Sequence, residues 1–153
     1  MEIINNLEEI DILARTIYGE ARGEYGRRDG GMAALIAVGN VVMNRLKAKT
    51  WYGLTLKEIC QKPFQFSCWN RQDPNRALIM SSQIEQEPIF KICREVAQQV
   101  VTYQWPDLTQ GSDHYYALTL SNPPAWSQQA QPRLKLGQHV FFKLTPSLSA
   151  GRS

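Results

Sequence analysis

The amino-acid sequence predicts a mainly helical α+β fold with a small β element toward its C-terminal end. Apolar residues recur at the spacing of an α-helix over residues 7–21 and 29–47, and again in a segment that begins at Pro88. Two short segments, 113–117 and 139–143, have the aromatic and β-branched residues that are typical of strands. A chain of 153 residues is long enough for one domain with a hydrophobic core and too short for two.

We expect this single domain to occupy residues 1–153, with its core over about residues 7–144. Residues 145–153 are small and polar, which favours a flexible tail. Neither an internal repeat nor a low-complexity tract divides the chain.

The first predicted helix places Glu20 at the edge of its apolar face, since Glu20 follows Ile17 by three residues. Asn5 or Asn6 can cap the start of this helix, and acidic side chains occupy its first turns, where the helix dipole favours them. Glu24 comes one turn after Glu20 if the helix continues through Gly23. Several glycines then break the pattern.

The second predicted helix, residues 29–47, is apolar on nearly every face, which is typical of a buried central helix. Its polar exceptions, Asn40, Asn44 and Arg45, need hydrogen-bond partners, and we expect Asn40 to point toward the cleft.

The middle of the chain is less regular. Residues 55–58 form a capping box that starts a short helix, which Pro63 ends. The aromatic-rich segment 64–70 has neither a helical nor an alternating period, and residues 77–83 predict a weak helix.

Composition excludes several classes of protein. The net charge of +3 and the pI of about 8.8 suit a polyanionic partner, but no cluster of Lys and Arg predicts a nucleic-acid surface. The longest apolar run, Met32–Met43, is too short to span a membrane, since a transmembrane helix needs roughly 20 residues. The first six residues are polar and acidic, unlike a secretory signal. We therefore expect a soluble protein that is made in the cytoplasm.

The three cysteines, Cys60, Cys68 and Cys93, are an odd number without motif spacing, so we expect free thiols. Only His114 and His139 could join them at a zinc ion, and no Cys or His pair has the required spacing. We expect no metal and no cofactor.

The block Ile17-Tyr18-Gly19-Glu20-Ala21-Arg22-Gly23-Glu24 is the most informative stretch for function. A carboxylic acid that cleaves a glycosidic bond must hold its proton near neutral pH, and partial burial favours the protonated form. Glu20, at the rim of an apolar face, fits the acid of a glycan-cleaving enzyme. The alternative is a solvated surface network with Arg15, Arg22 or Arg27.

A second carboxylate decides the type of mechanism, and Glu24, Asp29 and Asp113 are the candidates. Glu20 and Glu24 would lie on the same side of the bond, with Cβ atoms about 6 Å apart, which fits poorly with a water held on the opposite side. A one-acid mechanism, in which a hydroxyl of the substrate attacks, is at least as plausible.

Many aromatic residues fall in predicted loops and strand ends, where their rings could stack on sugars. These residues are Trp51, Tyr52, Phe64, Phe66, Trp69, Tyr115, Tyr116 and Trp126. The alternative is that half of them, Phe66 and Tyr116 among them, fill the core. His114 and His139 could orient a substrate or serve a structural role. Ser67 and Cys68 lack the glycine frame of a nucleophile elbow.

These residues carry a resemblance to a known family. Residues 13–24, with Ala37-Val38-Gly39-Asn40-Val41-Val42-Met43-Asn44-Arg45, resemble the catalytic domain of the SleB/CwlJ-type cell wall hydrolases, the spore-cortex-lytic enzymes. Shorter similarities follow in the same order at Phe64-Gln65-Phe66-Ser67, His114-Tyr115-Tyr116, Asn122-Pro123, Trp126 and residues 136–142.

The resemblance implies a lysozyme-like fold with a small β element beside the cleft. It implies cleavage of the β-1,4 bond between N-acetylmuramic acid (MurNAc) and N-acetylglucosamine (GlcNAc), with Glu20 as general acid and base. The lytic transglycosylase type of cleavage, which closes a 1,6-anhydro ring on MurNAc, is implied as well. Substrate-binding positions implied by the resemblance are Tyr18, Phe66, Ser67, His114, Tyr115, Tyr116, Asn122, Trp126 and His139.

The chain also differs from the spore enzymes, because it shows neither a signal peptide nor a wall-binding module. We therefore expect a monomeric phage or prophage endolysin that reaches the cell wall with the help of a holin or another lysis protein. A hydrolytic muramidase that uses Glu20 with Glu24 or Asp113 is the alternative within the class. A non-catalytic glycan-binding or virion structural protein is the alternative from another class, although such a protein has no need to keep Glu20.

Overall fold

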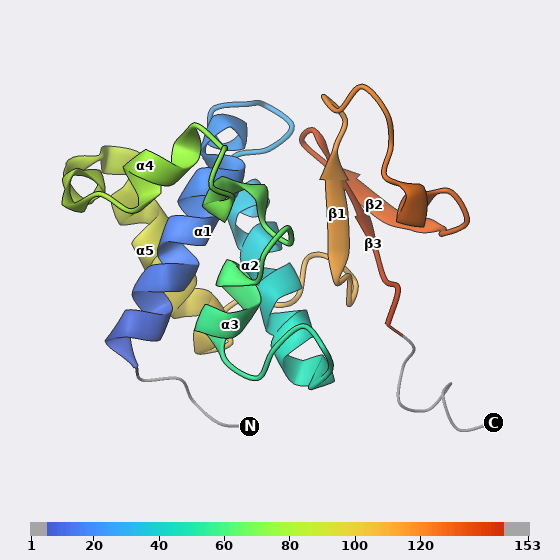
Figure 1. The fold of residues 1–153 in the computed structure, drawn as a ribbon, viewed down its shortest axis with the longest axis horizontal. Coiled ribbons are helices and arrows are strands. Elements are labelled where there is room, and N and C mark those ends of the chain that lie inside the picture. The colour runs from blue at the N-terminus through green and yellow to red at the C-terminus, as the bar shows by residue number, and fades with distance from the viewer. Residues whose placement is uncertain (1–5, 146–153) are drawn as a thin grey trace.

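A computed structural model describes residues 6–145 of the chain as a group of helices beside a small antiparallel sheet (Figure 1). The α-helices are α1 (Leu7–Tyr25), α2 (Met32–Ala48), α3 (Leu56–Gln61), α4 (Asn75–Ile79) and α5 (Pro88–Val101). Short 3₁₀ turns lie at η1 (Ser67–Trp69), η2 (Ser82–Gln86) and η3 (Ala125–Ser127). The strands are β1 (His114–Ala117), β2 (Pro132–Leu136) and β3 (His139–Phe142). The α+β, mainly helical prediction is confirmed, and residues 146–153 of the predicted tail lie outside the described residues.

Helix α1 is the centre of the helical part and packs against α5, α2 and α3. Asn6 caps its start, since the Asn6 side chain accepts hydrogen bonds from the backbone of Glu8 and Glu9 at 2.9 and 3.2 Å. The helix continues through Gly23 and ends at Tyr25. Glu20 and Glu24 are therefore one turn apart on the same helix.

Helix α2 is buried from Ala34 to Met43, as its nearly uniform apolar character predicts. Gly39 lets α5 approach closely, because a Cβ at this position would lie 3.1 Å from a methyl carbon of Val100. The expected orientation of Asn40 is wrong. Its side-chain oxygen accepts a hydrogen bond of 2.9 Å from the backbone of Leu108, so Asn40 holds the loop that precedes β1 and does not face the cleft.

The sequence also misplaced the bounds of two helices. Helix α2 begins at Met32, three residues later than predicted, because Gly31 has a positive φ of 66° that is incompatible with a helix. The predicted weak helix at residues 77–83 is replaced by α4 and the separate 3₁₀ turn η2.

The sheet has the order β1-β3-β2, and both pairs are antiparallel. Tyr115 of β1 pairs with Phe141 of β3. Strand β2 was not predicted, because Pro132-Arg133-Leu134-Lys135-Leu136 carries a proline and two cations and forms an exposed edge of the sheet.

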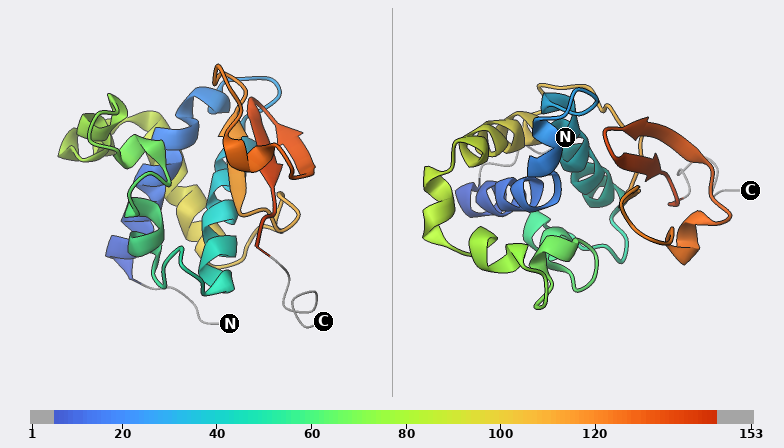
Figure 2. Two further views of the ribbon diagram at one scale, coloured as in Figure 1. Left: turned by 45° about the vertical axis from the view of Figure 1, so that its right-hand side comes forward. Right: turned by 90° about the horizontal axis from the view of Figure 1, so that it is seen from above.

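Hydrogen bonds connect the sheet to the helices near the turn between β2 and β3. The Glu24 carboxylate accepts the backbone N–H of Gln138, and the N–H of Gly137 donates to the carbonyl of Asp29 over 2.7 Å. Seen from above in Figure 2, the sheet lies on one side of the helices. Across residues 6–145, none of the helices combines the length and the apolarity needed to cross a membrane.

Candidate active site

Glu20 lies on α1 in a half-buried position, and two hydrogen bonds hold its carboxylate. The Tyr115 hydroxyl of β1 donates to one oxygen, and the backbone N–H of Cys68 in η1 donates to the other over 3.1 Å. Three segments that are far apart in the sequence therefore meet at this carboxylate. The carboxylate is fixed in position, which is what acid–base chemistry requires of it.

The surface-network alternative for Glu20 is wrong in the described part of the chain. Arg15 pairs with Asp11 at 2.7 Å and Arg27 with Asp29 at 2.9 Å. Arg22 donates to the side-chain oxygen of Asn75 over 2.6 Å. Each arginine that could have paired with Glu20 thus has another partner, and Glu20 forms no ion pair within residues 6–145.

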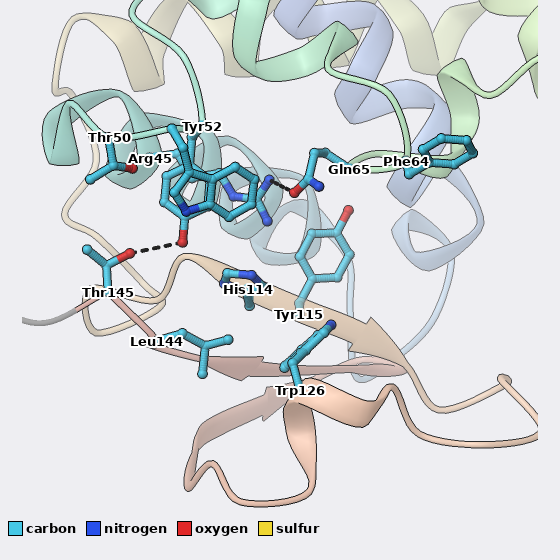
Figure 3. A pocket seen from close by; sticks show the side chains of 11 residues that line it. Arg45, Thr50, Tyr52, Phe64, Gln65, His114, Tyr115, Trp126, Leu144 and Thr145 are labelled. Atoms are coloured by element: carbon cyan, nitrogen blue, oxygen red, sulfur yellow. Dashed lines mark hydrogen bonds between the residues drawn. The ribbon is translucent and has the colours of Figure 1, made fainter.

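Tyr115 connects Glu20 to a cavity between the helices and the sheet. Its ring packs against the rings of His139 and Phe141, with centroids 4.8 and 5.5 Å away, and its hydroxyl points from β1 toward the helices (Figure 3). Burial raises the pKa of Tyr115 well above its usual value, and the charge of Glu20 raises it further. The phenol therefore stays protonated and donates to the carboxylate.

Gly19 makes room for the segment that holds the second oxygen of Glu20. A Cβ at position 19 would lie 2.6 Å from the Cβ and 2.8 Å from the Sγ of Cys68, so the helix touches the η1 turn at this point. The thiol of Cys68 is buried, and burial together with the nearby Glu20 charge raises its pKa. Cys68 is thus a packing residue whose backbone serves the site.

Gly19→Ala is expected to lower the free energy of unfolding by about 1–3 kcal/mol, because the new methyl group overlaps Cys68. The displaced backbone N–H would also weaken its bond to Glu20, so activity should fall as well. Gly23→Ala, in the same helix, is the matched control. Nothing lies within 4 Å of a Cβ at Gly23, and the change should raise stability by about 0.5–1 kcal/mol. Urea unfolding of both variants measures the contrast, and equal effects would contradict this packing.

The cavity has a volume of about 670 Å³, in the usual range for a ligand site. Aromatic rings form much of its wall, and the residues Trp51 and Phe64 are 59% and 85% exposed. The lining residues are Arg45, Thr50, Trp51, Tyr52, Phe64, Gln65, His114, Tyr115, Trp126, Leu144 and Thr145 (Figure 3). Exposed rings with neighbouring hydrogen-bonding groups suit a sugar chain.

All three candidates for a second carboxylate have other partners, and Asp29 is the one that pairs with Arg27. The Glu24 carboxylate accepts the backbone N–H of Gln138, and its Oε2 lies 3.9 Å from Nε of Arg27. The Asp113 side chain accepts hydrogen bonds from Leu144 and Thr145 backbones at 2.8 and 3.0 Å. It also lies 3.0 Å from Nδ1 of His114. Burial alone would raise the pKa of Asp113, but these hydrogen bonds outweigh it and lower the pKa to about 2.

Three of the substrate-binding positions implied by the resemblance line the cavity: His114, Tyr115 and Trp126. Trp51, Tyr52 and Phe64, predicted as rings that could stack on sugars, line it as well. The His114 and Trp126 rings pack together with centroids 4.9 Å apart. Tyr116 does not line the cavity and packs against Trp126 and Phe142, with ring centroids 6.1 and 5.7 Å away.

The remaining predicted residues lie elsewhere. Tyr18 is buried against Phe90 and lies about 200° around the helix axis from Glu20, so it belongs to the core. Phe66 is also buried, at 1% exposure. Ser67 and Asn122 are exposed and do not line the cavity.

His139 is buried beside Tyr115, and its Nδ1 has no hydrogen-bond partner within residues 6–145. Burial lowers the pKa of His139, although the charges of Glu24 and Glu20 oppose this effect. A neutral imidazole therefore supports the Tyr115 ring.

Sequence reasoning did not assign Arg45, Gln65 or Thr145 to the site. Arg45 stood out as a polar residue in an apolar helix and as the last residue of a block that carries the family resemblance, and these signals could have marked it. All three cysteines are buried free thiols, as their number and spacing predicted. Burial raises the pKa of Cys60 and of Cys93 to about 12, so neither is a nucleophile.

Solved structures of known proteins share this fold. The catalytic domain of Bacillus cereus SleB matches with a TM-score of 0.60 and 20% identity, over 92% of this chain and 95% of that one. The catalytic domain of the germination-specific lytic transglycosylase SleB from Bacillus anthracis also has a TM-score of 0.60 and 20% identity. That match covers 92% of this chain and 100% of the other. Among curated proteins, none matches this chain.

These structural matches confirm the predicted SleB-like fold. The family model described as Cell Wall Hydrolase matches residues 30–142, which include the cavity residues of α2 and of the sheet and begin after Glu20. Because this match covers well over half of the sequence, the chain belongs to the cell wall hydrolase family.

Proposed function

We propose that this cell wall hydrolase cleaves the MurNAc–GlcNAc β-1,4 bond of peptidoglycan as a lytic transglycosylase, with Glu20 as its general acid and base. The observation that carries the proposal is the Glu20 carboxylate, held by Tyr115 and Cys68 beside an aromatic cavity while Glu24 and Asp113 are bound elsewhere. The fold shared with a protein described as a lytic transglycosylase supports the same chemistry.

In the first step, protonated Glu20 gives its proton to the glycosidic oxygen, and the bond to C1 of MurNAc breaks. The leaving GlcNAc carries away that proton as its O4 hydroxyl. The C6 hydroxyl of MurNAc then attacks C1, and its proton returns to the Glu20 carboxylate. One acid thus serves both steps, and the product is a 1,6-anhydro ring with no net consumption of water.

Tyr115 and Cys68 act by positioning this acid. The Tyr115 hydroxyl and the Cys68 N–H hold the two carboxylate oxygens from different sides. When Glu20 is ionised, both donors bind its oxygens and hold the carboxylate in place to accept the C6 proton. Tyr115 belongs to strand β1 of the sheet, and Cys68 belongs to the η1 turn, which packs on α1. The positions of both donors are therefore set before substrate binds.

A hydrolytic muramidase remains the second candidate, since it needs the same acid. An inverting or retaining hydrolase also needs a carboxylate across the bond from the acid. Glu24 shares a helix face with Glu20, and the oxygens of Asp113 accept hydrogen bonds from the chain near Thr145. The geometry therefore favours the one-acid mechanism.

The products distinguish the two reactions. Purified peptidoglycan digested with the protein is expected to yield muropeptides with 1,6-anhydro-MurNAc ends. Mass spectrometry identifies them, because an anhydro end is lighter than a reducing end by about 18 Da, the mass of one water. Reducing MurNAc ends would establish the muramidase instead. An absence of released fragments would favour the non-catalytic glycan-binding or structural alternative. The phage origin, the cytoplasmic synthesis, the holin and the monomeric state stay predictions.

A further inference from the structure

Arg45 is a buried cation at the cavity, and its charge pairs with no carboxylate within residues 6–145. The residue is only 4% exposed, and the guanidinium lies over the rings of Tyr52 and Phe66, 4.8 and 4.9 Å from their centroids. The Nε atom donates to the carbonyl of Asp113 over 2.7 Å, and Nη1 lies 3.3 Å from the side-chain oxygen of Gln65. Nη2 donates to no group within residues 6–145. A buried charge usually has an ionic partner, so this arrangement needs an explanation.

The surroundings of Arg45 leave room for an anion from outside the chain. None of the residues that line the cavity is acidic, and Arg45 is its only Lys or Arg among the described residues. The Asp113 carboxylate raises the pKa of Arg45 but forms no ion pair with it, because its oxygens accept hydrogen bonds from Leu144 and Thr145. Burial is the larger effect and lowers the pKa of Arg45, as expected for a cation without a paired anion.

We infer that Arg45 binds a carboxylate on the lactyl arm of MurNAc, and this inference rests on the proposed function. MurNAc differs from GlcNAc by that arm, which ends either in its own free carboxylate or in a peptide stem that carries carboxylates. Tyr115 both holds Glu20 and lines the cavity, so a glycan strand placed for cleavage at Glu20 lies beside this cavity. A guanidinium fixed against two rings is preorganised to bind a carboxylate with its planar fork. Arg45 is thus a specificity residue that separates MurNAc strands from uncharged glycans.

Binding to Glu20→Gln protein tests the inference, because the strands then remain uncleaved. Two fluorescent ligands are compared by anisotropy: strands with peptide stems, and strands stripped by an amidase so that the lactyl carboxylate is free. Each is also measured after carbodiimide-mediated amidation, which neutralises its carboxylates. We expect amidation to weaken binding about tenfold, equivalent to about 1.4 kcal/mol. An effect on the stripped strands identifies the lactyl carboxylate, and an effect confined to stem-bearing strands identifies the stem. Unchanged Kd values for both would overturn the inference.

Substitution assigns the effect to Arg45. In Glu20→Gln protein that also carries Arg45→Gln or Arg45→Met, native and amidated strands should bind equally well. Methionine keeps apolar contact with both rings and guards against a folding defect in the glutamine variant. Arg94→Gln removes the same charge from α5, away from the cavity, and should keep the tenfold preference. A preference that survives both Arg45 changes would place the carboxylate elsewhere.

The two proposals fail in distinguishable ways. Equal binding of native and amidated strands, with anhydro products from the unmodified protein, would contradict only the role of Arg45. A preference for carboxylates without anhydro products would support that role and contradict the transglycosylase reaction.

Discussion

Glu20→Gln is expected to reduce peptidoglycan cleavage about 10²–10⁴-fold, the usual contribution of a general acid or base. The amide keeps the size of the side chain and its acceptor for Tyr115, but it can neither donate the proton to the leaving oxygen nor take one from the C6 hydroxyl. Release of soluble muropeptides over time measures the rate, and circular dichroism checks the fold. Activity within about threefold of the original protein would remove Glu20 from the catalytic role.

Glu24→Gln is the matched control on the same helix face. Its remaining carbonyl oxygen can still accept the N–H of Gln138, so the β2–β3 turn should stay in place. We expect activity to stay within about tenfold of the original protein, far from the loss at Glu20. A loss as large as that of Glu20→Gln would instead support the hydrolase, in which Glu24 is the second carboxylate.

The sequence predicted those features that depend on local periodicity. The apolar spacing of α1 was enough to place Glu20 at the edge of a buried face. The nearly uniform apolar character of α2 was enough to predict that this helix is buried. Sequence spacing does not show which groups from distant segments meet. Tyr115 was named as a substrate-binding residue and Cys68 only as a free thiol outside a nucleophile elbow. Their common contact with Glu20 depends on how β1 and η1 come to lie beside α1 in the folded chain.

The wrong predictions have related causes. Asn40 was expected at the cleft because a polar residue in a buried helix needs a partner, yet the partner is the Leu108 backbone in a loop. Strand β2 was missed because exposed edge strands tolerate the proline and cations that argue against a strand. Tyr18 lies within the most specific block, yet its side chain faces α5 and not Glu20. In each case the residue type was informative, but tertiary contacts decided where the side chain points or whether the segment pairs as a strand.

Asp113 is expected to make the stability of this protein depend on acid. Its folded-state pKa is about 2, below the ordinary value of 3.8, because hydrogen bonds from the chain near Thr145 and from His114 outweigh the effect of burial. The unfolded chain therefore binds the proton more readily than the folded one. The contribution, roughly 2 kcal/mol, is fully present above about pH 4 and is lost as the pH falls toward about 2. His139, whose pKa is lowered by burial, adds a loss that begins below about pH 6.5.

Asp113→Asn isolates this contribution, since the other titrating groups are common to both proteins. In the variant, the NH₂ group of the amide faces backbone N–H donors that bind the carboxylate of the original protein. The free energy of unfolding at neutral pH should therefore fall by about 2–3 kcal/mol. Between about pH 4 and about pH 2, the variant should lose less stability than the original protein. Urea unfolding across this range measures both effects. Asp29→Asn is the control, because its carboxylate is 44% exposed and an exposed ion pair contributes little. Parallel pH curves for the original protein and Asp113→Asn would mean that the hydrogen bonds from His114, Leu144 and Thr145 do not lower the pKa of Asp113.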